Sequence, residues 1–299
     1  MTEEQKNFAK KFEHFHDKYY KHMLLLPIFL MLISSVYMFS FYSKTGDFIN
    51  KDISLTGGTS VTIYGNFDSV KLQSDLSDKL NEINIREIYD LVTREKIAII
   101  IETKSDGGET RFVMEDYLGY ELDDKNSSFE FTGPALSKSF YKQLLIAILF
   151  AFFFMGAVVF IMFRKFVPSL AVIISALADI FMTLSLVNFL GIEMSSAGIV
   201  AFLMLIGYSV DTDILLTNKV LRSHEGAINE RIFKSFNTGM AMTFIAIVSI
   251  SVSLLIVKSF SVVLTQIFTV ILIGLIFDIV NTWVTNVSLI KWYAKKHEN

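Results

Sequence analysis

The stretch Ala-Gly-Ile-Val-Ala-Phe-Leu-Met-Leu-Ile-Gly-Tyr-Ser-Val-Asp-Thr-Asp-Ile-Leu-Leu runs from Ala197 to Leu216. It is long enough to cross a bilayer as an α-helix. Two carboxyl groups, those of Asp211 and Asp213, lie in its last two turns. An ionisable group at the middle of a membrane helix costs roughly 2.5–3.5 kcal/mol on insertion scales, so such groups are rare and usually mark an ion or proton path. The stretch therefore predicts a membrane helix that takes part in ion movement.

Six apolar runs of this length occur in the 299 residues, 52% of which are hydrophobic. They are Met23–Tyr42, Leu144–Phe163, Val167–Leu190, Ala197–Leu216, Gly239–Val257 and Val262–Val284. This pattern predicts a polytopic α-helical membrane protein with six transmembrane helices. The chain has no Cys, which excludes disulfides and thiolate catalysis, and its net charge of −3 gives no reason to expect a nucleic-acid partner.

Lysine and arginine residues gather at one end of the six runs. Residues 1–22 contain five lysines, and basic residues follow the second, fourth and sixth runs, whereas the 191–196 loop has none. The positive-inside rule then places both termini in the cytoplasm of a multi-pass cell-membrane protein. The predicted organisation is a cytoplasmic leader (1–22), a first transmembrane helix (23–42), an extracytoplasmic domain (43–142) and a five-helix transmembrane region with a cytoplasmic tail (143–299).

The segment 43–142 is patterned like a folded domain. Ser60–Tyr64 alternates as a half-buried strand, Val70–Ile83 has helical spacing, and Arg86–Val92 with Lys96–Ile101 suggests a strand pair. We expect the Gly pair at 107–108 to break the chain and residues 115–130 to form a loop or a short helix. The order of strand, helix, strand and strand predicts a small α+β, ferredoxin-like domain of the split βαβ type between helices 1 and 2.

Asp211 and Asp213 are two residues apart, which places them about 200° apart around a helix. Asp211 shares its face with Gly207 and Asn218, and Asp213 shares the other face with Ser209. Both faces of this helix should therefore meet protein or water rather than lipid.

Two further acids are expected inside the membrane. Asp179 lies near the middle of the third run, and Asp278 lies in the inner half of the sixth, with Asn281 one turn on. No basic residue lies deep inside any run, so some of the four carboxyl groups should be protonated at neutral pH and able to exchange a proton. A fixed hydrogen-bonded network is the alternative. Lys234, just before the fifth run, is a further candidate, although cytoplasmic loops commonly carry such lysines.

Two glycine motifs flank the outside domain. Gly57-Gly58-Thr59 precedes its first strand, where adjacent glycines allow positive φ or a close backbone approach, and Gly133-Pro134 introduces the second membrane run. Patterns for ATP hydrolysis, zinc proteolysis or serine hydrolysis are missing from the sequence, so no enzyme activity, cofactor or metal is expected.

Together these motifs resemble the SecD/SecF protein-export family of the RND superfamily, and most of all its archaeal members. The resemblance rests on the segments 55–59 (Leu-Thr-Gly-Gly-Thr), 132–134 (Thr-Gly-Pro), 206–213 (Ile-Gly-Tyr-Ser-Val-Asp-Thr-Asp), 237–239 (Asn-Thr-Gly) and 278–283 (Asp-Ile-Val-Asn-Thr-Trp). It covers most of the chain.

The resemblance implies a subunit that uses a proton or sodium gradient to assist polypeptide export. Its implied partners are a SecD-like subunit, the SecY translocation channel, the unfolded exported polypeptide and membrane lipids. The essential acid of bacterial members aligns with Thr212, whereas that of the SecD partner aligns with Asp211, so we favour Asp211 as the coupling residue. Family members tend to have Arg at the position of Lys234.

Two other functions stay open on the sequence. One is half of an RND-type exporter for lipids or small molecules, although such exporters usually carry both halves in one chain. The other is a structural assembly factor whose buried acids are static. Substitution of the acids by asparagine separates these hypotheses, since static acids would leave export unchanged.

Overall fold

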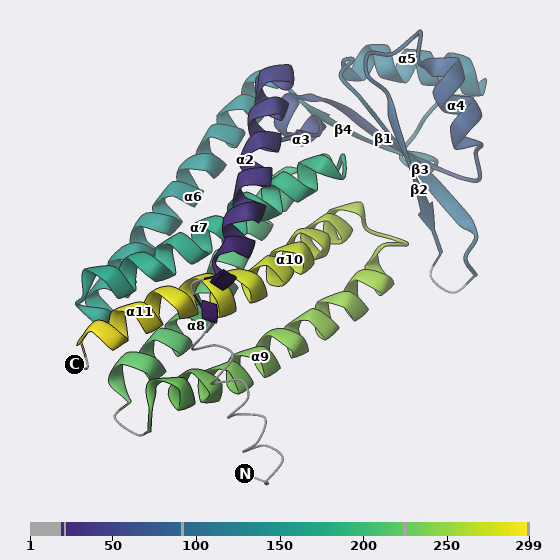
Figure 1. Ribbon diagram of the computed structural model, residues 1–299. Helices are drawn as coiled ribbons and strands as arrows, with labels where there is room; N and C mark the ends of the chain where they lie inside the picture. The colour runs from purple at the N-terminus through teal and green to yellow at the C-terminus, as the bar shows by residue number, and fades with distance from the viewer. Residues whose placement is uncertain (1–18, 21, 91–92, 224–225, 298–299) are drawn as a thin grey trace.

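The structure, a computed structural model, describes residues 19–20, 22–90, 93–223 and 226–297, and consists of a membrane helix bundle with a small domain at one end (Figure 1). The prediction of six membrane helices is confirmed within these residues. They are α2 (Leu25–Thr45), α6 (Pro134–Phe163), α7 (Phe166–Phe189), α8 (Ser196–Arg222), α9 (Ile228–Val257) and α10 (Val262–Val280), the last continuing through a π-helical turn, η1 (Asn281–Asn286), into α11 (Val287–His297).

Several helices extend beyond the apolar runs that predict them. α6 begins at Pro134, well before Leu144, and α9 begins at Ile228, well before Gly239. Hydropathy marks the lipid-embedded turns only, whereas the backbone stays helical into the polar flanks. The expected boundary between residues 142 and 143 thus falls inside α6. Most of the expected leader, residues 1–18 and 21, lies outside the described residues.

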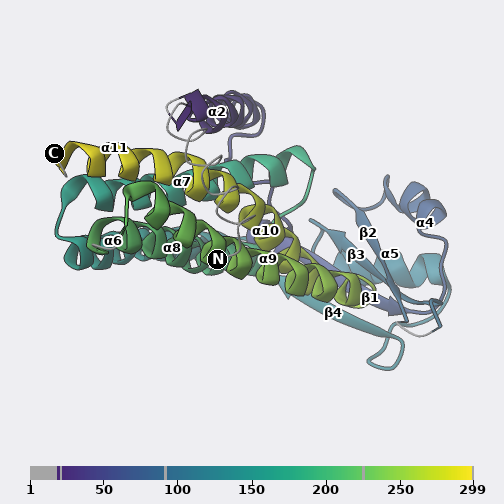
Figure 2. The same ribbon diagram turned by 60° about the horizontal axis from the view of Figure 1, so that its bottom comes forward.

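The helices of the bundle differ in how much protein surrounds them. In their most apolar windows, 56% of the residues of α7 and of α8 are buried, against 17% in α2 and α6 and 11% in α9. α10 packs against α7, α8 and α9. Figure 2 shows α2 on one side of the bundle, where it contacts α7. The centre of the bundle is therefore built by α7, α8 and α10.

The domain between α2 and α6, which we call the outside domain after its predicted location, has the ferredoxin-like fold that the sequence predicts. Its four-stranded antiparallel sheet has the order β2-β3-β1-β4. The strands are β1 (Gly58–Tyr64), β2 (Asn84–Tyr89), β3 (Lys96–Thr103) and β4 (Ser127–Thr132), and the helices are α3 (Ile53–Thr56), α4 (Ser69–Leu76) and α5 (Gly107–Leu118). α4 and α5 lie on the same side of the sheet (Figure 1).

Three local expectations for this domain are wrong in whole or in part. The Gly pair at 107–108 does not break the chain but begins α5, because the Asp106 side chain accepts hydrogen bonds from the Gly108 and Glu109 amides at 2.7 and 3.3 Å. In 115–130, the first four residues belong to α5 and a loop follows, but the last four are strand rather than loop, since β4 begins at Ser127 and pairs with β1. The expected helix to Ile83 ends at Leu76, and residues 91–92 of the expected strand lie outside the described residues.

The sheet has an apolar face and a polar face. Val61, Ile63, Ile99 and Ile101 point to the helices α4 and α5 and form a buried core with them. The alternate positions of β1 and β3, which include Glu102, line a cavity that is shared with the outer ends of the membrane helices. The polar face of the domain therefore turns towards the bundle.

Candidate ion-coupling site

Three of the four predicted membrane acids meet at the centre of the bundle. Asp179 comes from α7, Asp213 from α8 and Asp278 from α10. Their side chains are almost completely removed from solvent, with 0%, 0% and 1% of their surface exposed. The three helices that pack most deeply thus each contribute one carboxyl group to a single buried cluster.

Hydroxyl and amide groups contact the carboxyl of Asp179. The Ser209 hydroxyl of α8 lies 2.5 Å from Asp179 Oδ2, and the Asn281 Nδ2 group donates to Oδ1 at 2.7 Å. Asp179 is therefore tied to both α8 and η1. Asn281 is a predicted site residue, and the structure places it in direct contact with this acid.

Asp213 and Asp278 share one hydroxyl group. The Thr282 Oγ1 atom lies 2.9 Å from Asp213 Oδ1 and 3.0 Å from Asp278 Oδ1. A hydroxyl carries a single proton, so it can donate to only one of the two carboxyl groups. If the hydroxyl donates to one carboxyl group, its contact with the second is a hydrogen bond only when that second carboxyl group is protonated and donates to the hydroxyl oxygen. The geometry accommodates one proton at this pair.

A π-helical turn positions the polar partners of the cluster. Asn281, Thr282 and Asn286 all lie in η1, and Asn286 Nδ2 donates to Asp213 Oδ1 at 2.8 Å. Single π-turns inside α-helices are frequently found at functional sites, because the wider turn shifts side chains off the regular helical spacing. Here it brings three polar side chains towards the two neighbouring helices.

Some oxygen atoms of the cluster keep free acceptor capacity. Within the described part of the chain, Asp213 Oδ2 and Asp278 Oδ2 are buried without a hydrogen-bond partner. An ionised oxygen in that position is unfavourable, since burying a charge without a partner carries a large desolvation penalty. A cluster of this kind is stable with protons bound and becomes strained when they leave.

The remaining predicted residues lie outside the cluster. Asp211 is exposed on the opposite face of α8, together with Gly207 and Asn218. Lys234 is half exposed and pairs with Glu230 one turn away on α9 at 2.9 Å. The prediction that Asp211 is the coupling residue stays untested, and the buried Asp213 on the other face of α8 is its alternative. The role of Lys234 also stays a prediction.

Sequence reasoning did not select Ser209, Thr282 and Asn286 as site residues. The four-residue spacing between Ser209 and Asp213 and between Asp278 and Thr282 is a signal that could have found the first two. Asn286 has no such signal, because it reaches Asp213 only through the π-turn.

The backbone conformation at Gly57 and Gly58 and the close approach of β3 explain the glycine motif of the outside domain. Gly57 and Gly58 both have positive φ, of 88° and 150°, and a Cβ atom on Gly58 would lie 2.3 Å from the Thr103 carbonyl oxygen. Thr59 is buried and donates to the Ser105 carbonyl at 2.8 Å. Gly133 caps the N-terminus of α6, and Pro134 is its first residue.

Comparison with known proteins gives consistent matches in sequence. Residues 115–296 match the family model described as protein export membrane protein SecD/SecF, C-terminal. A protein-export membrane protein SecF of Methanocaldococcus jannaschii is 37% identical over 285 residues, which is 94% of this chain and 98% of the relative. A SecF of Methanothermobacter thermautotrophicus is 38% identical over 252 residues, 83% of this chain and 85% of the relative. The expectation that the chain is not an enzyme agrees with these names.

The fold is similar to that of a solved structure. SecDF of Thermus thermophilus, described as a translocon-associated membrane protein, superposes with a TM-score of 0.69 at 20% identity over 92% of this chain. A second SecDF structure, in a super-membrane-facing form, gives a TM-score of 0.60 at 19% identity. The chain spans 38% of the length of each of these proteins.

Proposed function

Because the chain belongs to the SecD/SecF family of protein-export membrane proteins, we propose that it assists polypeptide translocation with energy from an ion gradient. Protons, or alternatively sodium ions, pass through the buried cluster of Asp179, Asp213 and Asp278, and their passage moves the outside domain. A SecD-like subunit supplies the second half of the membrane machine, since the solved SecDF chain is much longer than this one. The exported polypeptide emerges from the SecY channel.

The shared hydroxyl of Thr282 is the observation that carries this proposal. It holds Asp213 of α8 and Asp278 of α10 together while one proton lies between them. Loss of that proton leaves two carboxylates at one hydroxyl in a site of low dielectric, where like charges repel strongly. Proton loading and release therefore favour different positions of α8 relative to α10.

The available energy is sufficient for a two-state movement. Each charge that crosses the membrane contributes about 2.3 kcal/mol per 100 mV. A shift of a two-state equilibrium from 1:99 to 99:1 requires about 5.5 kcal/mol. Three ions that cross a potential of about 100 mV contribute about 7 kcal/mol and meet this requirement.

The test compares acids on the two faces of α8. Asp213→Asn keeps the volume and hydrogen bonding of the buried residue but removes its titration, and Asp211→Asn does the same on the exposed face. We measure completion of an arrested export substrate in membrane vesicles with and without an imposed proton gradient. The expected result is that Asp213→Asn, Asp179→Asn and Asp278→Asn lose the response to the gradient while Asp211→Asn keeps it.

Other outcomes of this experiment assign the function differently. A wild-type response from Asp213→Asn with none from Asp211→Asn would place coupling on the exposed face of α8, as the sequence alone favours. Full activity in all four variants would support static acids in an assembly factor. A sodium gradient applied in the presence of a protonophore distinguishes the two ions.

A further inference from the structure

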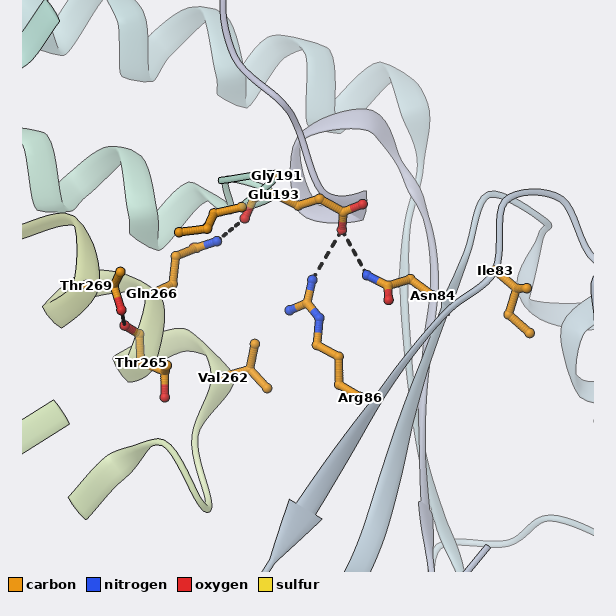
Figure 3. A pocket seen from close by; sticks show the side chains of 10 residues that line it. Ile83, Asn84, Arg86, Gly191, Glu193, Val262, Thr265, Gln266 and Thr269 are labelled. Atoms are coloured by element: carbon orange, nitrogen blue, oxygen red, sulfur yellow. Dashed lines mark hydrogen bonds and ion pairs between the residues drawn. The ribbon is translucent and has the colours of Figure 1, made fainter. Parts of the chain in front are cut away.

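One strand of the outside domain contacts the outer loops of two helix pairs. At the end of β2, the Tyr89 amide donates to the Ser259 carbonyl in the α9–α10 loop at 2.9 Å. At its beginning, Asn84 Nδ2 and an Arg86 guanidinium nitrogen lie 3.0 and 3.3 Å from Glu193 Oε2 in the α7–α8 loop. Figure 3 shows both side chains directed from β2 towards this carboxylate. β2 therefore touches the loops that precede α8 and α10.

Gln266 joins the beginnings of α8 and α10 at the same place. This buried residue of α10 donates through Nε2 to the main-chain carbonyl of Glu193 (Figure 3), and its Oε1 atom accepts from the Ser195 amide at 3.1 Å. Ser195 caps α8, because its hydroxyl oxygen accepts from the Gly198 amide at 3.1 Å. A Cβ atom at position 198 would lie 2.7 Å from Gln266 Oε1, so a glycine is needed for this approach.

The two helices that meet at Gln266 also carry two of the buried acids. Asp213 lies further along α8 and Asp278 further along α10, where Thr282 joins them. A change in the position of α8 relative to α10 at the acids must appear at the other ends of these rigid helices. Glu193 lies at that point, with its carbonyl bound by α10 and its carboxylate bound by the outside domain.

The attachment of the outside domain has a firm part and a weak part. Main-chain hydrogen bonds connect Asp52 and Asn50, just before α3, to Met194 at 3.1 and 2.6 Å. The contact of Arg86 with Glu193 is instead made by partly exposed side chains. Exposed ion pairs are weak compared with the energy that one charge gains in crossing an energised membrane. The main-chain bonds, including the one from Tyr89 to Ser259 at the other end of β2, suit pivots, and the ion pair suits a contact that opens.

Arg86 has a second carboxylate that remains with it when this contact opens. Glu102 of β3 lies 3.0 Å from the same guanidinium nitrogen and belongs to the outside domain. A cavity of about 570 Å³ lined by β2, the α7–α8 loop and the start of α10 leaves room for the side chain to move. Release of Glu193 therefore leaves Glu102 beside the Arg86 guanidinium.

We propose that Arg86 and Glu193 form a releasable contact through which movement of α8 against α10 is transmitted to the outside domain, with Gln266 as the positioning residue. This inference rests on the proposed function, because it assumes that the gradient moves these helices. The inference adds the contact through which the movement of the membrane helices reaches the outside domain. The residues concerned are not among the hydrogen-bond partners of the buried acids, so their loss should uncouple export from ion flow rather than stop the flow.

The test is Glu193→Ala, measured for proton uptake and for gradient-dependent export in the same vesicles that contain the full export machinery. We expect proton uptake at the wild-type rate and a loss of the gradient response of about fivefold or more, the lower range of coupling between two sites. Glu193→Gln keeps an acceptor for Asn84 and Arg86 without the charge and should recover part of the response. Lys79→Gln is the matched control, because it removes an exposed ion pair to Asp116 inside the outside domain.

A second measurement follows the position of the domain without any activity assay. The chain has no Cys, so spin labels on the variants Lys125→Cys in the outside domain and Lys258→Cys at the end of α9 report one distance. Glu193→Ala should broaden this distance distribution, and Lys79→Gln should leave it unchanged. A wild-type export response in Glu193→Ala, a loss of proton uptake, or an unchanged distance distribution would each overturn the inference. Failure of the proposed function would appear separately, as wild-type protein without a gradient response.

Discussion

At the scale of single residues, the arrangement around Thr282 distinguishes this site from a set of isolated buried acids. One hydroxyl group contacts carboxyl groups from two different helices. The hydroxyl can reverse its donor and acceptor roles, so a proton can pass from one side to the other without a large movement of heavy atoms. The polar contacts of the cluster are therefore suited to transfer as well as to stability.

Replacement of Thr282 by Val tests the bridging role. Valine has nearly the same shape but lacks the hydroxyl, and a buried polar group left without a partner costs about 1–3 kcal/mol. We expect Thr282→Val to slow proton uptake into vesicles by about tenfold or more, since 1.4 kcal/mol corresponds to a factor of ten. Thr282→Ser keeps the hydroxyl and should stay near the wild-type rate. Equal rates of proton uptake in Thr282→Val and in wild type would show that the Thr282 hydroxyl takes no part in proton transfer.

Glu102 makes the stability of the outside domain dependent on pH. Burial raises the pKa of Glu102 from 4.5 to about 7, with smaller contributions from the Asp52 and Glu193 carboxyl groups and an opposing one from Arg86. The folded protein then holds a proton that the unfolded chain has lost between pH 4.5 and 7. Stability therefore falls as the pH rises through this window and stays low above it.

Glu102→Gln should remove this pH dependence. At pH 8 we expect the variant to unfold at a higher temperature than wild type, because its free energy of unfolding is larger by at most about 3 kcal/mol. At pH 5 the two proteins should differ little. Circular dichroism of the intact protein in detergent measures the unfolding temperature at both pH values. Glu130→Gln, on an exposed acid of β4, is the control. A variant that is less stable than wild type at pH 8 would show that attraction to Arg86 outweighs burial.

At the scale of elements, close backbone contacts fix how neighbouring elements meet. A Cβ atom on Gly274 of α10 would lie 2.2 Å from a Leu205 methyl group of α8, and one on Gly239 of α9 would lie 2.4 Å from the Trp283 ring. These glycines allow the helices around the acid cluster to approach each other. The segments 237–239 and 278–283, far apart in sequence, are thereby brought into contact.

Gly58→Val tests the same principle in the outside domain. The φ of 150° disfavours a β-branched residue, and the Cβ atom would collide with the Thr103 carbonyl oxygen across the β1–β3 pair. We expect a loss of about 1–3 kcal/mol in domain stability, the usual range for a residue forced into such a backbone conformation. Limited proteolysis of the inserted protein detects the loosened domain.

Gly133→Ala is the matched control for this substitution. Gly133 has a φ of −67°, and no atom lies within 4 Å of a Cβ built there. Resistance to protease should therefore stay close to that of wild type. Similar resistance in Gly58→Val would show that the β1–β3 pair tolerates the side chain and that the motif is only a turn.

At the scale of the whole molecule, the outside domain adjoins only one end of the helix bundle (Figure 1). The α7–α8 and α9–α10 loops contact this domain, whereas the basic residues that end α8 and α11 lie at the opposite end. The positive-inside rule assigns that basic end to the cytoplasm. We therefore propose that the domain faces the outside and that the chain ends in the cytoplasm.

Single cysteines test this topology, since the chain has none of its own. Lys125→Cys in the outside domain and Lys296→Cys near the end of α11 replace exposed residues. A membrane-impermeant maleimide should label the Lys125→Cys variant in intact cells and the Lys296→Cys variant only after permeabilisation. The reverse pattern would invert the orientation and place the domain in the cytoplasm.

Much of this architecture could be predicted from the sequence because it depends on local physical chemistry. Length and hydropathy define six membrane helices, since an apolar run of about 20 residues has few alternatives to spanning a bilayer. The alternation at Ser60–Tyr64 and the helical spacing after Val70 define the first strand and helix of the outside domain in the same way. β4 escaped prediction because its pairing with β1 depends on residues far away in the chain.

Sequence periodicity alone predicts that Asp179, Asp213 and Asp278 lie within membrane helices and that Asp211 and Asp213 point in different directions. It could not decide which of these two acids faces the protein, because both faces of α8 carry polar residues at helical spacing. The packing of α7, α8 and α10 decided this, burying Asp213 beside Thr282 and leaving Asp211 exposed. Only the tertiary structure could do so, since the π-turn and the contacts between helices place side chains by interactions that no local spacing records.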